Sequence, residues 1–259
     1  FLDDLRKSVK SENPNAIIIG EVWEDATNKF AYGQRRKYLL GEELDSVMNY
    51  PFADAVLDFV RFANGDSFFN SVMSIVENYP PQVLSVLMNH IGTHDTVRAI
   101  TRLAGENPDG HDRTWQFEHN TLSKFDYLRG VSMMKIASLI QFTLPGVPSI
   151  YYGDEIGMQG MKDPFNRGCM AWDDVNDELL KWYKRLGQIR HSSKAFINGD
   201  FEKVYCDGGV IAYSRNCESD SVLLAINNSN ESKKIFVGTQ WDNSYSLFDE
   251  ICADGFITL

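Results

Sequence analysis

The chain has 259 residues, of which 43% are hydrophobic and 24% charged, and its formal net charge is −11. An acidic surface repels nucleic-acid phosphates and anionic lipids, so we expect no nucleic-acid partner and no membrane partner. No segment approaches the roughly 18 consecutive apolar residues of a membrane span. The length allows one large domain, or a medium domain followed by a small one.

The chain opens on an apolar helical face. Phe1, Leu2, Leu5 and Val9 share one side of a helix predicted over about 1–11, and no capping residue precedes Phe1. A helix that begins uncapped on an apolar position looks interrupted. We therefore expect these residues to be a piece of a longer protein.

Residues 1–191 predict four strand-then-helix units. Three consecutive isoleucines, Ile17–Ile19, indicate a parallel strand buried on both faces. Alternating strands and helices predict a parallel sheet, in a (β/α) barrel or a doubly wound fold. A complete barrel takes about 250 residues, so these units would form half a barrel with long loops. The predicted strands are 16–19, 46–48, 83–88 and 149–152, and the predicted helices are 1–11, 53–63, 66–78, a short one after Asp95, 122–143 and 177–191.

Residues 192–259 predict a second, smaller domain. Short and partly alternating apolar runs are separated by turn clusters such as Asp207-Gly208-Gly209. This pattern is typical of an antiparallel β-sandwich. The predicted strands are 204–206, 210–215, 222–227, 234–237 and 244–248.

The cysteines indicate a reducing compartment. None of them has the spacing of a metal site. Cys206 and Cys217 flank the turn at 207–209, but hairpin pairing places Cys206 near Ile211 and Cys217 near Gly199 or Asp200. We therefore expect free thiols and a cytoplasmic protein, with any N-terminal signal lying outside these residues. The four cysteines are Cys169, Cys206, Cys217 and Cys252.

Polar and aromatic side chains follow each of the four predicted parallel strands. Because the carboxyl ends of barrel strands meet on one face, we expect these groups to lie together there. A single carboxylate after a strand is weak evidence, but a set after four successive strands is hard to assign to solvation alone. The set comprises Glu21 and Trp23, Asn49 and Tyr50, His90 and residues 93–98, and Asp154, Glu155 and residues 163–167.

Glycoside hydrolysis needs such a set. One carboxylic acid donates a proton to the leaving oxygen, and a carboxylate about 5–5.5 Å away attacks the sugar when configuration is retained. Further hydrogen bonds to the ring hydroxyls strengthen as the sugar distorts toward its oxocarbenium-like transition state. Aromatic rings supply apolar platforms for sugar faces.

Several segments resemble the α-amylase superfamily. Ile19-Gly20-Glu21-Val22-Trp23 resembles the family segment that carries the acid/base glutamate, and residues 89–96 resemble the segment with the third catalytic carboxylate. Residues 145–158 are similar to the eighth-strand region. Residues 44–52 and 163–167 resemble the neopullulanase, cyclomaltodextrinase and maltogenic amylase branch, and the trailing sandwich resembles the family's C-terminal domain.

The resemblance implies a role for each matching residue. It makes Glu21 the general acid/base and Asp95 the carboxylate that stabilises the transition state by hydrogen-bonding the sugar in subsite −1. It makes His94 a ligand of the same sugar. Weaker candidates for lining the substrate cleft are Trp23, Asn49, Tyr50 and Arg167.

Two departures from the family pattern matter. The family's nucleophile is an aspartate on the fourth barrel strand, in a segment of the form Arg-x-Asp, and this chain has no such segment. The resemblance of residues 1–10 to the following helix places that aspartate before Phe1, so the chain alone is expected to be inactive. Many relatives also have a histidine after the tryptophan of the glutamate motif, where this chain has Glu24.

Two functions stay open at this stage. The resemblance implies a retaining hydrolase of α-1,4 glucosidic bonds in starch-derived oligosaccharides, cyclodextrins or pullulan, and whether it also cleaves α-1,6 bonds stays open. The alternative is a non-catalytic carbohydrate-binding or structural relative of the barrel. Unpaired strand edges predict a partner, which is the missing half of the barrel, a second chain or a second copy of this one. No cofactor is expected, and a calcium requirement, known in some relatives, stays open.

Three polar residues near the predicted site have competing interpretations. His90 either packs inside the barrel mouth or takes part in function, and the sequence favours neither. Asp154 and Glu155 are expected to fix the geometry of their loop rather than to touch substrate.

Overall fold

Four short parallel strands form the sheet around which the first 192 residues are arranged. The computed structural model describes residues 1–248 and 254–259. Strand β1 (Ile19–Gly20) pairs with β4 (Ser46–Val47), and β5 (Met88–Asn89) pairs with β6 (Val147–Pro148). A parallel bridge from Met48 to Met88 joins the two pairs. The order β1-β4-β5-β6 follows the chain and confirms the predicted parallel sheet.

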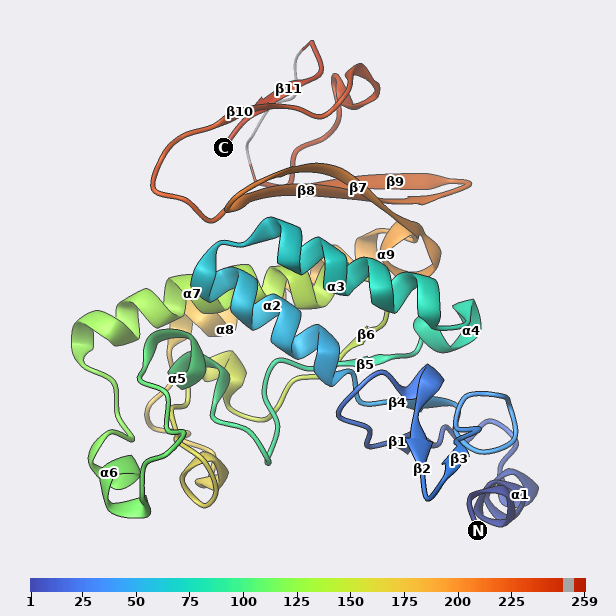
Figure 1. Cartoon of the computed structure of the whole chain (residues 1–259). Helices are drawn as coiled ribbons and strands as arrows, with labels where there is room; N and C mark the ends of the chain where they lie inside the picture. Colours follow the sequence, from blue (N-terminus) through green and yellow to red (C-terminus); the bar gives the residue numbers. More distant parts are fainter. Residues whose placement is uncertain (249–253) are drawn as a thin grey trace.

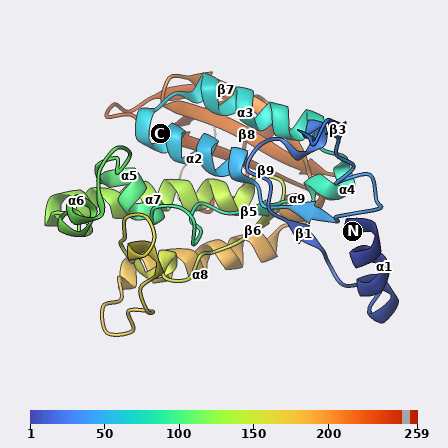
Figure 2. The ribbon, with the colours of Figure 1, turned by 60° about the horizontal axis from the view of Figure 1, so that its bottom comes forward.

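Helices cover one side of this sheet (Figure 1). Each predicted helix is present, within about three residues of its expected start. Helices α7 and α8 run side by side, as the second view also shows (Figure 2). Across the described ranges, none of the helices is both long enough and apolar enough to span a bilayer. The helices are α1 (Leu2–Glu12), α2 (Tyr50–Phe62), α3 (Gly65–Asn78), α4 (Pro81–Leu84), α5 (Ala99–Ala104), α6 (Arg113–Glu118), α7 (Lys124–Thr143), α8 (Asp177–Ser192) and α9 (Ala195–Asn198).

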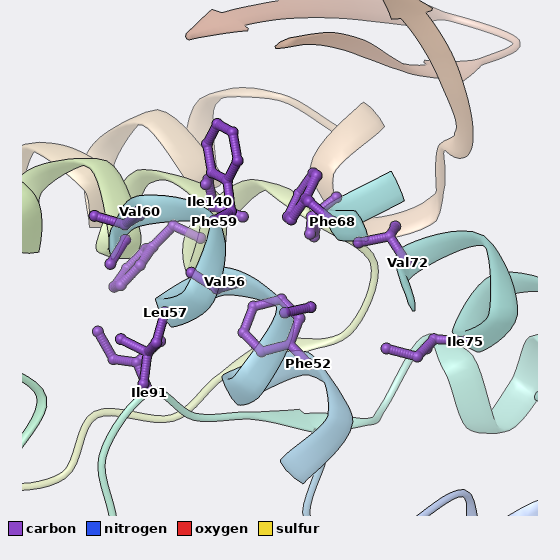
Figure 3. Packing of buried hydrophobic residues seen from close by; sticks show 14 of the residues in the cluster. Phe52, Val56, Leu57, Phe59, Val60, Phe68, Val72, Ile75, Ile91 and Ile140 are labelled. Carbon is purple, nitrogen blue, oxygen red and sulfur yellow. The ribbon is translucent and has the colours of Figure 1, made fainter. Parts of the chain in front are cut away.

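The main core lies where α2, α3 and α7 meet over the strands. Apolar side chains recur on the inner side of α2, where Phe52, Val56 and Phe59 are buried. They face Phe68 and Val72 of α3, with side chains from the β5 loop and α7 alongside (Figure 3). This apolar stripe is what makes α2 a covering helix of the sheet.

Three strand predictions were wrong. The apolar run 83–88 is not a strand, because Pro80 and Pro81 begin the short helix α4 and only Met88–Asn89 pairs. The last parallel strand is Val147–Pro148, ahead of the predicted 149–152. Residues 244–248 form no strand. The structure adds a hairpin of β2 (Phe30–Ala31) and β3 (Gln34–Arg35) in the loop after β1.

The isoleucine run is buried on one face only. Ile18 packs against the core, whereas Ile17 and Ile19 are 62% and 46% exposed. The prediction of burial on both faces is therefore wrong for the described chain. Strand β1 lies at the edge of the sheet, and the face that carries Ile17 and Ile19 has no covering layer within residues 1–248 and 254–259.

The C-terminal part forms two stacked antiparallel sheets, as predicted. Strands β7 (Asp200–Asp207), β8 (Val210–Cys217) and β9 (Asp220–Asn227) make one sheet, and β10 (Lys234–Phe236) pairs with β11 (Phe256–Thr258). Figure 1 shows the larger sheet between the helices and the β10–β11 pair. Side chains of β8 alternate accordingly: Ile211 and Tyr213 join the main core, and Val210 and Ala212 join a second cluster with β10.

Polar contacts fix the larger sheet to the helices. The Asn228 amide donates to the carbonyls of Phe59 and Val60 at the end of α2, at 2.9 and 3.0 Å. The buried Arg215 guanidinium donates to the Thr143 carbonyl at the end of α7 (2.7 Å) and twice to the Gly199 carbonyl. Burial lowers the pKa of Arg215 to about 10, so the side chain stays charged at neutral pH.

The thiols lie as the hairpin predicted. Cys206 is opposite Ile211, and Asp200 is opposite Asn216, one residue before Cys217. Cys169, Cys206 and Cys217 are free. Cys252 and its predicted free thiol lie outside the described residues.

We predict that Arg215→Met lowers the free energy of unfolding by about 3 kcal/mol, because it leaves buried carbonyls without a donor. Thermal unfolding of the two proteins measures the difference. Arg185→Met is the matched control, since Arg185 is an exposed arginine on α8, and its effect should stay within about 0.5 kcal/mol. Equal melting temperatures for the Arg215→Met and unsubstituted proteins would contradict the prediction.

We also predict that the isolated 259-residue chain associates in solution. Strands β1 and β6 each have one neighbour in the described sheet, and apolar Ile17, Ile19, Val147 and Ile150 are exposed beside these edges. Open strand edges flanked by apolar side chains pair readily with other chains. Light scattering measures the mass, and a stable, well-folded monomer would rule the prediction out.

Candidate active site

Glu21 stands directly after β1 and is held by two aromatic residues. The Trp23 indole N–H donates to Glu21 Oε1 at 2.9 Å, and the Tyr50 hydroxyl lies 3.5 Å from the same oxygen. The rings of Trp23 and Tyr50 stack with their centroids 4.1 Å apart and their planes 13° from parallel. Trp23 is still 51% exposed, so this cluster presents an aromatic surface beside the carboxylate.

The start of α2 positions Tyr50. Asn49 caps the helix by accepting a hydrogen bond from the Phe52 amide at 3.3 Å, and Pro51 occupies the first turn. The Asn49 amide also donates to Asn89 Oδ1 at 2.9 Å. Asn49 therefore does not join the exposed cluster: its side chain is buried and holds Tyr50 from within the fold.

Tyr50 lies near both Glu21 and Asp95. Burial raises the pKa of the Tyr50 phenol, a hydrogen bond with Thr93 lowers it, and the carboxylates of Glu21 and Asp95 both raise it. The phenol therefore stays protonated at neutral pH, with its hydroxyl 3.5 Å from Glu21 Oε1.

Asp95 is held by side chains from both of its neighbouring segments. His94 Nε2 lies 3.0 Å from Asp95 Oδ2, and Arg167 Nη2 lies 3.2 Å from Oδ1. Arg167 Nε also donates to the His94 carbonyl at 3.0 Å and pairs with Asp163. The structure thus brings Arg167, distant in sequence, into the same group as His94 and Asp95.

His90 lies beneath this group. It is buried, and its ring meets Tyr50 edge-on at 4.6 Å between centroids. Burial lowers the pKa of His90 to about 4, with the distant Asp54 opposing the shift, so the imidazole is neutral at physiological pH. The edge-on contact with Tyr50 supports the first of the two interpretations of His90, in which its side chain packs inside the barrel mouth.

A buried ion pair joins the loops after β5 and β6. The Arg98 guanidinium packs against the rings of Tyr151 and Tyr152, 4.3 and 4.5 Å from their centroids, with Asp154 3.7 Å away. Burial raises the pKa of Asp154 to about 7, and the Arg98 charge opposes that rise. Glu155 accepts a hydrogen bond from the Gly153 amide at 2.8 Å, which fits a role in loop geometry.

The sequence analysis included Arg98 and Asn166 in the polar segments 93–98 and 163–167 but gave neither residue a role of its own. Arg98 stands alone between apolar Val97 and Ala99, and an unpaired charge in such a setting was a usable signal. Asn166 gave no such signal, because an asparagine in a loop is ordinarily a turn residue. Glu24, which replaces a histidine of many relatives, pairs with Lys29.

The arrangement can donate and accept protons around a polar ligand. Glu21 and Tyr50 form one contact group, and His94, Asp95 and Arg167 form a second, in the segments that follow β1, β4, β5 and β6. Both carboxylates lie near enough to Tyr50 to raise its pKa. Trp23 offers a ring face next to the carboxylate. Within residues 1–248 and 254–259, no group of three or more histidine, cysteine, aspartate or glutamate side chains is placed to hold a metal ion.

Models of known protein families match both parts of the chain. The family model of the α-amylase catalytic domain matches residues 1–183, and that of the α-amylase C-terminal domain matches residues 199–244. Similar proteins include the cyclomaltodextrinase of Thermoanaerobacter pseudethanolicus, 35% identical over 92% of this chain, and neopullulanase 2 of Thermoactinomyces vulgaris, 32% identical over 92%. The chain spans only 36% of the length of each of these relatives.

Solved structures agree with this assignment. A cyclomaltodextrinase structure with 29% sequence identity superposes with a TM-score of 0.78, covering 100% of this chain and 40% of the other. The Nostoc punctiforme debranching enzyme, at 24% identity and a TM-score of 0.79, shares the fold. The parallel sheet is therefore part of an α-amylase-type (β/α)8 barrel, and the chain belongs to the α-amylase family of glycoside hydrolases.

Proposed function

We propose that this chain supplies part of the active site of a retaining α-glucan hydrolase. The observation that carries the proposal is that two carboxylates, Glu21 and Asp95, follow strands of one parallel sheet. Glu21 is held by Trp23 and Tyr50, and Asp95 by His94 and Arg167. The substrates are starch-derived oligosaccharides, cyclodextrins or pullulan, cleaved at α-1,4 bonds, with α-1,6 bonds as a second target. Similar proteins named cyclomaltodextrinase, amylopullulanase and neopullulanase support this substrate class.

In this mechanism Glu21 acts twice. Its carboxylic acid donates a proton to the glycosidic oxygen while a carboxylate nucleophile attacks the anomeric carbon, which breaks the glycosidic bond and forms a glycosyl–enzyme ester. The Glu21 carboxylate then takes a proton from water, whose oxygen attacks the same carbon and releases the sugar. The nucleophile is supplied by a segment outside these residues, so the chain alone does not turn over substrate.

Asp95 stabilises the positive charge that develops on the sugar in the transition state of each of these two steps. Its carboxylate accepts hydrogen bonds from sugar hydroxyls, and such bonds strengthen as the ring becomes positively charged. His94 binds the same sugar, and Arg167 holds the Asp95 carboxylate toward the cleft. The exposed Trp23 ring gives the sugar an aromatic surface, and Trp23 and the buried Tyr50 keep Glu21 in place.

We further propose the partners and the compartment. The open edges of β1 and β6 are covered by the remaining half of the barrel, in the same polypeptide or a second chain, with a homodimer as the alternative. The free thiols Cys169, Cys206 and Cys217 favour a cytoplasmic protein. Cell fractionation tests this compartment, and recovery of the protein from the culture medium would refute it.

We predict that Glu21→Gln lowers kcat on maltotriose by about 10²–10⁴-fold in the full-length protein, because the amide cannot donate the proton. The same variant should form the glycosyl–enzyme ester normally from α-maltosyl fluoride, whose leaving group needs little protonation. Steady-state rates and the burst of fluoride release measure the two effects.

Glu12→Gln serves as the matched control, since Glu12 is an exposed glutamate at the end of α1 and should leave kcat unchanged. Near-normal turnover of maltotriose by Glu21→Gln would reject the proposed acid. Tight binding of maltotriose by the unsubstituted protein without turnover would instead support the non-catalytic alternative.

A further inference from the structure

The loop that carries Asp95 is a short turn whose internal hydrogen bonds all involve Thr93. Thr93 Oγ1 accepts from the Asp95 amide at 3.2 Å, and the Thr93 amide donates to Thr96 Oγ1 at 3.1 Å. The Thr96 amide and Thr96 Oγ1 each lie 3.4 Å from the Thr93 carbonyl. These bonds leave the carbonyls of His94 and Thr96 to partners outside the loop, so the position of the Asp95 carboxylate also depends on those partners.

Asn166 supplies two of those contacts. Its side chain is fully buried, and its Nδ2 donates to the carbonyls of His94 and Thr96, at 2.7 Å in each case. Both acceptors are carbonyl oxygens, so the amide must present its NH2 group to them and not its oxygen. The two carbonyls belong to the residues on either side of Asp95, so one side chain fixes the backbone at both flanks.

Asn166 is itself anchored to the helix that follows Asp95. It belongs to the 3-10 turn Phe165–Arg167, which packs so closely on Gly160 that a Cβ there would lie 2.5 Å from the Phe165 carbonyl. The Gly160 carbonyl accepts from the Arg98 amide at 2.9 Å, and its own amide donates to Thr101 at 3.0 Å. The contacts form a closed ring from the Asp95 loop through Asn166 and Gly160 to α5.

We propose that Asn166 is a positioning residue that sets the place of the Asp95 carboxylate. The inference rests on the proposed function, in which Asp95 stabilises the transition state. Asn166 touches only the backbone of the loop, so it acts through Asp95, unlike Arg167, which contacts the carboxylate itself. A displacement of about 1 Å in such a group can lower a rate by about 10²-fold.

The test is a double-mutant cycle of Asn166→Ala and Asp95→Asn in the full-length protein. We expect Asn166→Ala to lower kcat on maltotriose by about 10–10²-fold and to change KM by less than about 3-fold, since the lost interaction acts mainly in the transition state. All four proteins are also assayed with α-maltosyl fluoride. On this one substrate Asn166→Ala should cost about 10–10²-fold by itself but less than about 3-fold in the Asp95→Asn background, because residues that act as a unit are not additive.

Asn120→Ala is the matched control. Asn120 Oδ1 accepts from the Met161 amide at 2.8 Å, so it supports the same segment as Asn166 without touching the Asp95 loop. We expect its kcat to equal that of the unsubstituted protein. Circular dichroism and thermal unfolding give the folded fraction by which each rate is divided.

Asn166→Asp covers the case in which the alanine variant fails to fold. It keeps the size of the side chain but sets a carboxylate against two carbonyl oxygens. Burial and the two carbonyl oxygens raise the pKa of the new carboxyl above its ordinary value of about 4. Its kcat relative to the unsubstituted protein should therefore rise as the pH falls from the alkaline to the acidic limit of the enzyme's stability, because a protonated carboxyl can donate one hydrogen bond. A flat ratio across this range would count against the proposal.

The remaining outcomes separate this inference from the proposed function. Equal losses from Asn166→Ala in both backgrounds, or an unchanged kcat beside an impaired Asp95→Asn variant, would overturn the role of Asn166 alone. Normal turnover by Asp95→Asn would overturn the proposed function and this inference with it.

Discussion

Three buried side-chain amides, those of Asn49, Asn89 and Gln141, form an amide line that connects β4, β5 and β6 near the ends of the strands. The candidate active site depends on this connection. The Asn49 amide donates to Asn89, and the Asn89 amide donates to the Pro145 carbonyl at 2.7 Å. Gln141 of α7 donates to the carbonyls of Asn89 and Ser149, at 3.0 and 2.9 Å. Strands of two residues have too few ladder bonds to fix their own register. These amides join β4, β5 and β6 at one level, and in a low-dielectric interior each such bond is strong and costly to break.

The amide line also explains why the segments after β4, β5 and β6, which differ in structure, lie close together at the candidate active site. Asn49 caps α2 and so presents Tyr50 toward Glu21 and Thr93. The segments after β5 and β6 leave from the same level and are then tied to each other by Arg98, Asp154 and Asn166. Each functional loop is irregular and exposed, as binding loops usually are, while the residues that hold it are buried. The positions of the exposed functional side chains are thus fixed by buried polar residues that contact their loops.

The sequence predicted the helices and the gathering of polar residues well, because both depend on local patterns. Helices were predicted at the positions of α2, α3, α7 and α8, and carboxylates after predicted strands singled out Glu21 and Asp95. Strand limits were harder to predict, since an apolar run such as 83–88 fits a strand or a helix, and Pro80 and Pro81 decided for α4. The buried state of Asn49 and the two contacts of Asn166 depend on segments far apart in the chain, such as 94–96 and 166, which no local pattern records.

The docking of the C-terminal sheet has a consequence for anyone who exchanges domains among relatives. The bonds that hold it end on backbone carbonyls of the catalytic part, those of Phe59 and Val60, and in turn the Gly65 amide donates to the Gly208 carbonyl of the sheet at 2.8 Å. Backbone groups are present in every relative, so the donors Asn228 and Arg215 of a transplanted sheet find carbonyl acceptors at the ends of α2 and α7. Compatibility then depends on the side chains that meet across the junction, where Ile211 and Tyr213 pack into the main core and the Tyr213 hydroxyl lies 2.7 Å from Thr143 Oγ1.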